Sequence, residues 1–245
     1  VIFIYNSTRD FDKALEYADK ALNILKSLPD SKKWMVDKKM ILFNMAICYK
    51  SKYQYSKSIE SYKKCIKIQE QINPNDVDEV GRDLLYLGRV FIVTQKLDSA
   101  IFYISKSIKA LRRKYKSENY TLATPYYSLG YIYTRQQKYE LANQNYAKAL
   151  KSLKGKYGEI NPNLVSLYNY MAANSYSSKK YKDVIQYQHY ALMSNTRNFR
   201  DTNVFAVPPM NDYYNAIFLF NSLRGKGMAF GKFSDNLNYL GMKQK

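Results

Sequence analysis

The segment Leu129-Gly130-Tyr131-Ile132-Tyr133 and the segment Tyr139-Glu140-Leu141-Ala142 decide the fold, because their spacing recurs along most of the chain. Two small residues, Gly130 and Ala142, lie 12 positions apart. The period between successive units is 44 residues once and then 42 residues three times. A period of this size predicts a solenoid of stacked units. The 12-residue interval returns in four more pairs: Ile2 and Ala14, Ala46 and Ser58, Gly88 and Ala100, and Ala172 and Val184.

Each unit has the pattern of two helices joined by a short turn. Tyr139, Ala142 and Tyr146 recur at helical spacing and form one apolar face. Gly130 predicts a point where a neighbouring helix comes close, since glycine costs a helix about 1 kcal/mol relative to alanine and close packing offsets that cost. The polar break at residues 135–138 predicts that the two helices form an antiparallel hairpin.

These residues resemble the tetratricopeptide repeat (TPR) family over about residues 1–195. The joints Gln71-Ile72-Asn73-Pro74-Asn75 and Gly158-Glu159-Ile160-Asn161-Pro162 are similar to those of the 42-residue repeat of kinesin light chains. The resemblance implies an all-α fold, a right-handed superhelical solenoid of about five antiparallel helix hairpins, the first of them truncated. We expect looser or altered packing in the fifth unit, which departs from the pattern at Ser175, Val184 and Gln188.

The composition is basic and rich in tyrosine. The 245 residues include 26 Tyr and carry a formal net charge of +19. Such a charge favours an acidic partner, either a protein or peptide or, as the second choice, nucleic acid. A low-GC coding sequence would also raise the lysine content without any selected partner. The densest basic cluster suits a solvated helix end; it comprises Lys106, Lys109, Arg112, Arg113, Lys114 and Lys116.

The two cysteines, Cys48 and Cys65, indicate a reducing compartment, and we expect a cytoplasmic location. They fall on the two helices of one hairpin at heights that differ by about 12 Å, so we expect no disulfide between them. No apolar run is long enough to span a membrane. Because the chain begins without Met and inside a helix, we expect it to be a fragment.

The repeat pattern ends near Asn195, so we expect a second region at residues 196–245. We predict an extended, partly buried connector and then a C-terminal helical hairpin, interrupted at Gly225 and Gly227. This region is either a cap on the solenoid or an arm to another domain. The runs at residues 222–227 and 236–240 resemble the arm that precedes the caspase-like CHAT protease domain of bacterial repeat proteins. That resemblance implies a sensor role for the repeats in a larger protein.

We find no pattern of catalytic, metal-binding or cofactor-binding residues, and we expect a non-enzymatic chain. His189 has no cysteine near it in sequence, which favours a packed or surface histidine over a metal ligand or a catalytic dyad. The run Gly225-Lys226-Gly227 lacks the other residues of a phosphate-binding loop. The carboxylates are too scattered to nominate a general acid and base.

The TPR resemblance implies that the first helix of each hairpin lines a concave groove. Arg and Tyr, which dominate binding hot spots, recur at the positions that point into this groove. We therefore predict a protein-interaction module, with a stand-alone scaffold or a nucleic-acid-binding solenoid as alternatives. The predicted partner-binding residues are Asn44, Lys50, Arg82, Arg89, Tyr127, Tyr131, Arg135, Asn169 and Tyr176.

Overall fold

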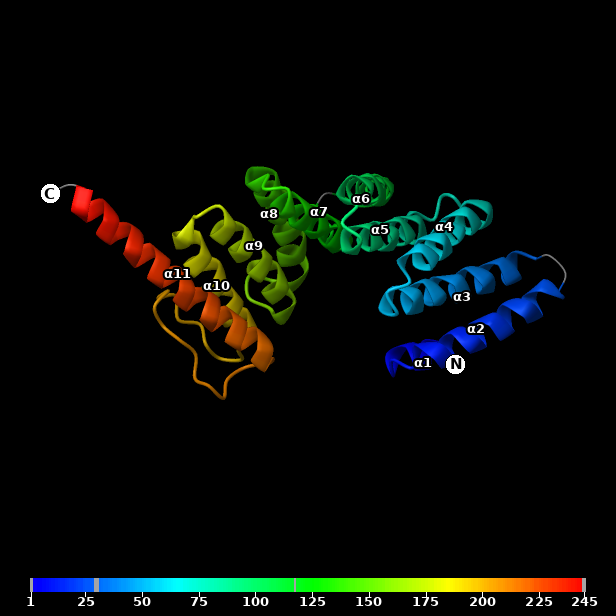
Figure 1. Cartoon of the computed structure of the whole chain (residues 1–245), viewed down its shortest axis with the longest axis horizontal. Helices are drawn as coiled ribbons and strands as arrows, with labels where there is room; N and C mark the ends of the chain where they lie inside the picture. The colour runs from blue at the N-terminus through cyan, green and yellow to red at the C-terminus, as the bar shows by residue number, and fades with distance from the viewer. Residues whose placement is uncertain (1, 29–30, 117, 244–245) are drawn as a thin grey trace. The chain divides into compact units, whose positions relative to one another are not determined.

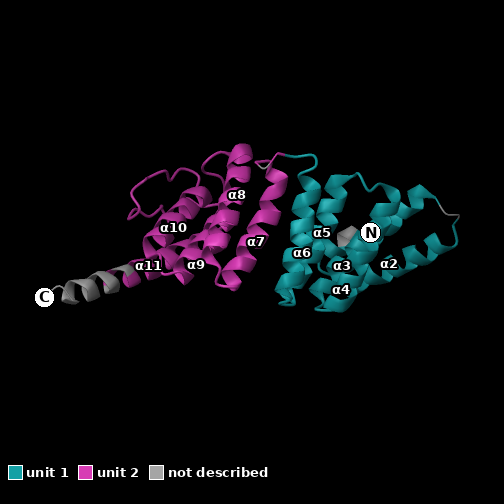
Figure 2. Cartoon of the chain, turned by 90° about the horizontal axis from the view of Figure 1, so that it is seen from above, with its two compact units in different colours: residues 1–115 teal, residues 116–245 magenta. Residues whose placement is uncertain are grey.

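The computed structural model describes residues 2–28, 31–116 and 118–243. These residues divide between two compact units, Val1–Tyr115 and Lys116–Lys245 (Figure 2). Each unit is all-α in its described residues, as predicted, and is built of consecutive antiparallel hairpins (Figure 1). The predicted division into residues 1–195 and 196–245 follows the repeat pattern and stays a prediction.

The first unit contains three hairpins, and their boundaries follow from local capping. The carboxylate or hydroxyl oxygens of Asp10, Ser31 and Asp76 each accept a hydrogen bond from the backbone N–H three residues later, which satisfies a donor that a helix start leaves open. The helices are α1 (Ile2–Ser7), α2 (Phe11–Lys26), α3 (Lys32–Ser51), α4 (Tyr55–Ile72), α5 (Val77–Val93) and α6 (Leu97–Leu111).

The second unit contains two hairpins and a long final helix. Short 3-10 turns, η1 (Tyr120–Leu122) and η2 (Pro162–Leu164), lead into the two hairpins. The polar break at residues 135–138 falls between the helices of the first hairpin, as predicted. The helices are α7 (Ala123–Arg135), α8 (Tyr139–Tyr157), α9 (Val165–Ser177), α10 (Tyr181–Asn195) and α11 (Ala216–Lys243).

All five hairpin turns share one backbone geometry. Each contains one non-glycine residue with φ near +60°, in the left-handed region. These residues keep the period of the repeat, which shows that the same turn recurs in every unit. They are Arg9, Tyr53, Gln95, Gln137 and Lys179.

The 12-residue interval marks the closest approach of the two helices in a hairpin. The Ser58 hydroxyl donates to the Ala46 carbonyl oxygen over 2.8 Å. A Cβ added at Gly88 would lie 3.4 Å from the Ala100 carbonyl oxygen and only 2.6 Å from Ile104 Cγ1. Small residues allow this close approach in these two hairpins, so the spacing in the sequence reflects a packing constraint.

The predicted C-terminal hairpin is wrong, because one continuous helix, α11, runs through Gly225 and Gly227. Gly225 and Gly227 together cost this helix about 2 kcal/mol relative to alanine, but burial of a stripe on α11 against α10 offsets that cost. The stripe recurs every three or four residues and consists of Leu219, Ser222, Lys226 and Ala229, all buried.

Helix α11 starts at Ala216, because polar groups before it hold the connector in a non-helical path. The Asp212 carboxylate accepts hydrogen bonds of 3.0–3.1 Å from the backbone N–H groups of residues 197–199. The Asn215 side chain then caps the helix by accepting from the Phe218 N–H over 3.0 Å. The connector at residues 196–215 is non-helical, as predicted; within it Pro208 is buried and Phe205 is exposed.

The residues of the fifth unit that depart from the repeat pattern change its packing, but they do not expose its core. Ser175, Val184 and Gln188 are all buried. Gly225 of α11 packs so closely on Gln188 that an added Cβ would lie 2.8 Å from its Nε2 atom. Ala229 joins Val184 in one hydrophobic cluster. Helix α11 therefore covers the altered positions of the fifth unit.

Candidate functional site

Two cations lie close together on the first helices of adjacent hairpins in the first unit. Lys50 lies in the last turn of α3 and Arg89 lies on α5, and both are half-buried. Burial lowers the pKa of the Lys50 ammonium, and the nearby charge of Arg89 lowers it further. Among the described residues, no carboxylate lies within ion-pair distance of either cation. An anion bound here would relieve their repulsion.

An aromatic side chain lies beside this pair of cations. The Arg89 guanidinium lies 5.8 Å from the centroid of the Tyr86 ring. Tyr86 in turn packs edge-on against Phe43, with ring centroids 5.0 Å apart. Cations beside aromatic faces suit recognition of a peptide that carries both carboxylate and apolar groups.

Two other predicted residues of the first unit already have intramolecular partners. The Arg82 guanidinium forms an ion pair with Glu79 and lies 4.9 Å from the centroid of the Phe43 ring. The Asn44 side-chain amide donates to the Met40 carbonyl oxygen over 2.8 Å, and its oxygen accepts from Asn6 over 3.2 Å. A ligand would have to compete with these contacts.

The second unit gathers three of the predicted residues on α7. Tyr127 stacks on Tyr170 of α9, with centroids 5.6 Å apart, and Tyr131 meets the same ring edge-on at 5.7 Å. The Arg135 Nη1 atom donates to the Tyr131 hydroxyl over 3.1 Å. Sequence reasoning missed Tyr170, although it directly follows Asn169 on a helix with several tyrosines.

The last two predicted residues lie apart from this tyrosine cluster. The Asn169 side-chain oxygen accepts a hydrogen bond from the Ser222 hydroxyl of α11 over 3.4 Å. Asn169 and Tyr170 also line a cavity of about 510 Å³ between α9 and α11, together with Arg224. Tyr176 packs edge-on against Tyr181, with centroids 5.7 Å apart, near the hairpin turn.

A buried ion cluster between α3 and α5 was not predicted. The Lys39 Nζ atom lies 2.9 Å from Asp83 Oδ2 and 2.7 Å from Glu79 Oε2, and it donates to Gln69 Oε1 over 2.6 Å. Burial raises the pKa of Asp83, and the hydrogen bond from Lys39 opposes that shift. Both Lys39 and Asp83 are buried, so the cluster joins two hairpins and is closed to a partner.

Both cysteines are packed in the interior. Cys48 and Cys65 form no disulfide, as predicted, and both are buried. Burial raises the pKa of the Cys65 thiol to about 12, so this thiol is protonated at neutral pH. The described residues contain no group of three or more His, Cys, Asp and Glu side chains placed to hold a metal ion.

In the described part of the chain no helix combines the length and apolarity needed to cross a bilayer.

His189 is packed, which is one of the two predicted alternatives. Its Nε2 atom lies 2.6 Å from the Asp201 carbonyl oxygen, which can only accept, so Nε2 carries the proton. Its Nδ1 atom then accepts from the Lys226 ammonium of α11 over 3.2 Å. Lys226 also donates to the Ala206 carbonyl oxygen over 2.8 Å. This buried group ties α10, the connector and α11 together.

Comparison with known proteins finds tetratricopeptide repeats in two parts of the chain. The family model of the tetratricopeptide repeat matches residues 41–72 and 123–152. None of the curated proteins matches the sequence significantly. Among solved structures, BtubC (BKLC) from P. vanneervenii is similar, with 16% identity, coverage of 93% of this chain and 84% of that chain, and a TM-score of 0.75.

Two further structures share the fold. A putative kinesin light chain from Podosopora anserina with nearly identical TPR-like repeats is 11% identical, with 78% of this chain and 89% of that chain covered and a TM-score of 0.64. The apo form of RapI is 16% identical, with 96% and 82% covered and a TM-score of 0.55. At such identities the likeness shows the fold alone.

Proposed function

Because residues 41–72 and 123–152 match the tetratricopeptide repeat and the chain shares the fold of solved repeat solenoids, we propose that it is a protein-interaction module that binds an acidic segment of a partner. The binding residues are those of the first helix of each hairpin. The observation that carries the proposal is the pair Lys50 and Arg89, which places two cations together without a described carboxylate partner. A carboxylate of the partner would supply the missing counterion, at a half-buried position where such a contact contributes more than at a fully exposed one.

The tyrosines of the second unit complement this charge. Tyr127 and Tyr131 provide large, rigid surfaces with polar tips, and Arg135 adds a donor beside them. Such residues contribute much of the binding free energy in known interfaces. We assign them to a second contact region for the same class of partner.

A selection of random displayed peptides tests this proposal. We expect peptides retained by the wild-type chain to be enriched in Asp and Glu. The variant Arg82→Ala/Arg89→Ala/Arg135→Ala should lose them, whereas the control Lys106→Ala/Lys109→Ala/Arg112→Ala removes the same charge from α6 and its end and should keep them. Equal retention by both variants would refute the assignment of the site.

We further propose that the repeats are the regulatory region of a larger protein, namely a CHAT-type protease. The alternative is that the repeats act as a free scaffold. The resemblance of residues 222–227 and 236–240 to the arm of such proteins motivates this. The hydrogen bond from Ser222 to Asn169 offers a contact between α11 and the predicted binding helix α9.

Coupling requires that a ligand prefer one of two arrangements of α11. A selected peptide should therefore change the hydrogen-exchange rates of α11, and unchanged rates at saturation would contradict the regulatory role. In the open reading frame after Lys245, the protease version predicts a His followed by a Cys, each at a strand end. A stop codon there would favour the scaffold.

A further inference from the structure

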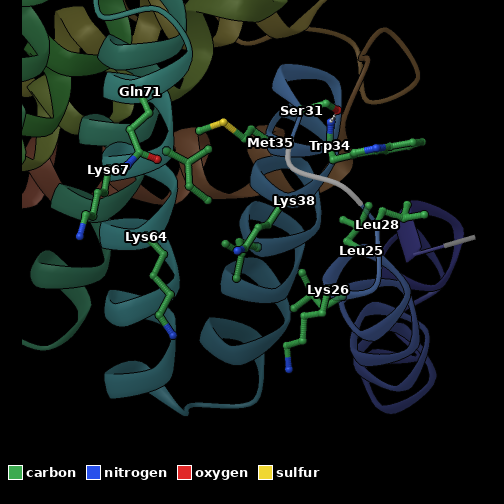
Figure 3. A pocket seen from close by; sticks show the side chains of 13 residues that line it. Leu25, Lys26, Leu28, Ser31, Trp34, Met35, Lys38, Lys64, Lys67 and Gln71 are labelled. Atoms are coloured by element: carbon green, nitrogen blue, oxygen red, sulfur yellow. Dashed lines mark hydrogen bonds between the residues drawn. The ribbon is translucent and has the colours of Figure 1, made fainter.

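A cavity of about 690 Å³ opens in the first unit between α2, α3 and α4 (Figure 3). This volume lies within the range of about 300–1,000 Å³ that is typical of ligand sites. Apolar side chains from all three helices form its floor, so the cavity favours apolar groups of a ligand. They include Leu22, Leu25, Trp34, Met35, Leu42 and Ile68.

Four lysines surround this apolar floor. Figure 3 shows Lys64 and Lys67 along α4, Lys26 on α2, and Lys38 on α3 between them. All four are exposed. Lys64 pairs with Glu60 one turn away, but neither Lys38 nor Lys67 has an ion pair with any described carboxylate. The rim of the cavity therefore carries excess positive charge.

The cavity lies on the other side of α3 from the predicted partner-binding residue Asn44. Successive helical residues are rotated by about 100°. Residues two positions apart therefore point about 200° away from each other. This holds for Lys38 and Met40, and again for Leu42 and Asn44. Leu42 lines the cavity and Lys38 lies on its rim, while Met40 is exposed on the side of Asn44. The cavity is thus separate from the site of the proposed function and does not depend on it.

We propose that this cavity binds an acidic amphipathic helix of a partner protein. The apolar residues of that helix, spaced three or four positions apart, enter the cavity, and flanking Asp and Glu side chains pair with the lysines. Cations on three sides call for several anions, which a peptide supplies and a single-headed amphiphile does not. The long, flexible lysine side chains can follow carboxylates at different positions on such a helix.

Trp34 gives a direct readout, because it is the only tryptophan in the chain and it lines the cavity. The probe is a synthetic helical peptide with Leu on one face and Glu beside it. We expect saturable binding with a blue shift of the Trp34 emission, weakened by salt. A peptide of the same composition in scrambled order, and one with Lys in place of Glu, should leave the emission unchanged.

Variants and competing occupants complete the test. Lys38→Ala/Lys67→Ala should weaken the peptide about three- to thirty-fold, from two partly exposed ion pairs, whereas Lys106→Ala/Lys109→Ala on α6 should not. An equal loss of affinity in both variants would show that only the net charge of the protein matters. That result would overturn the assignment of the peptide to this cavity. A response to laurate but not to the patterned peptide, or self-association that the peptide does not reverse, would also overturn the proposal, as would no response to any probe.

Discussion

Substitution of Gly130 by Ala should destabilise the hairpin of α7 and α8. A Cβ at this position would lie 2.5 Å from Tyr146 Cε1, 2.6 Å from Cδ1 and 3.0 Å from Cζ. Tyr146 is buried, and its hydroxyl lies 3.2 Å from the Thr134 hydroxyl in a shared hydrogen bond. The ring therefore has to move from a packed position to admit one methyl group.

The magnitude follows from three contributions. Overpacking a core costs about 1–3 kcal/mol, and loss of the hydroxyl contact adds about 1 kcal/mol. Alanine favours the helix over glycine by about 1 kcal/mol. The net loss is about 1–3 kcal/mol, which lowers the thermal midpoint by about 2–12 °C for a chain of this size.

Thermal unfolding followed by far-ultraviolet circular dichroism measures this loss. The matched control is Gly227→Ala on α11, where nothing lies within 4 Å of an added Cβ; we expect it to stabilise its helix by about 1 kcal/mol. The double variant Gly130→Ala/Tyr146→Ala should cost less than the sum of its single changes. If Gly130→Ala stabilises the protein as the control does, the close-approach explanation of the repeat is wrong.

Four further outcomes are expected. Asp83→Ala should cost about 3–5 kcal/mol in urea unfolding, because it removes the fully buried carboxylate that pairs with the buried Lys39; a loss below 1 kcal/mol would contradict the cluster. Burial lowers the pKa of His189 from its usual value near 6.5, so the unfolded chain binds more protons and stability should fall as pH falls below 6.5; His189→Gln should remove this slope. Burial lowers the pKa of Lys226 to about 8 from 10.5, so stability should rise with pH above about 8, and Lys226→Met should abolish the rise. Generic duplex and single-stranded nucleic acid should show no retention at moderate salt; an affinity that falls by about one log unit per log of salt for each phosphate contacted would favour the rival function.

The repeat architecture was predictable because its constraint is local and periodic. Small residues such as Ala46 and Ser58 occur 12 positions apart where two helices touch through a backbone carbonyl, and a Cβ added at Gly88 would come too close to the facing helix. The capping residues Asp10 and Asp76 likewise act within one turn of the helix that they begin. Residue spacing and helix capping of this kind can be recognised in a single sequence.

The C-terminal region was mispredicted because its packing is not local. Ser222 and Lys226 count as polar, yet both are buried on α11 against residues about 30–50 positions earlier, such as Asn169 and His189. The buried stripe on α11 therefore could not be recognised from residue polarity. The glycines in α11 were wrongly interpreted as breaks in the helix. Only the partners of a long-range contact explain why a lysine can lie in the interior.

The candidate site was predictable in residue type but not in detail. The pattern indicated Arg and Tyr on the first helices, and the structure brings Tyr127 and Tyr131 together around Tyr170. It also ties Arg82 to Glu79, a contact within one turn that competes with any partner. The proximity of Lys50 to Arg89 depends on how two hairpins stack, which no single helix pattern specifies.

Titration calorimetry of one selected acidic peptide tests the binding site most directly. The wild-type chain is compared with Lys50→Ala/Arg89→Ala and with the charge-matched control Lys109→Ala/Arg112→Ala. We predict that the first variant weakens binding by tenfold or more, about 1.4 kcal/mol, at unchanged thermal stability, and that the control binds as the wild type does. Equal affinities for all three proteins would contradict the assignment of partner binding to the first helices of the hairpins.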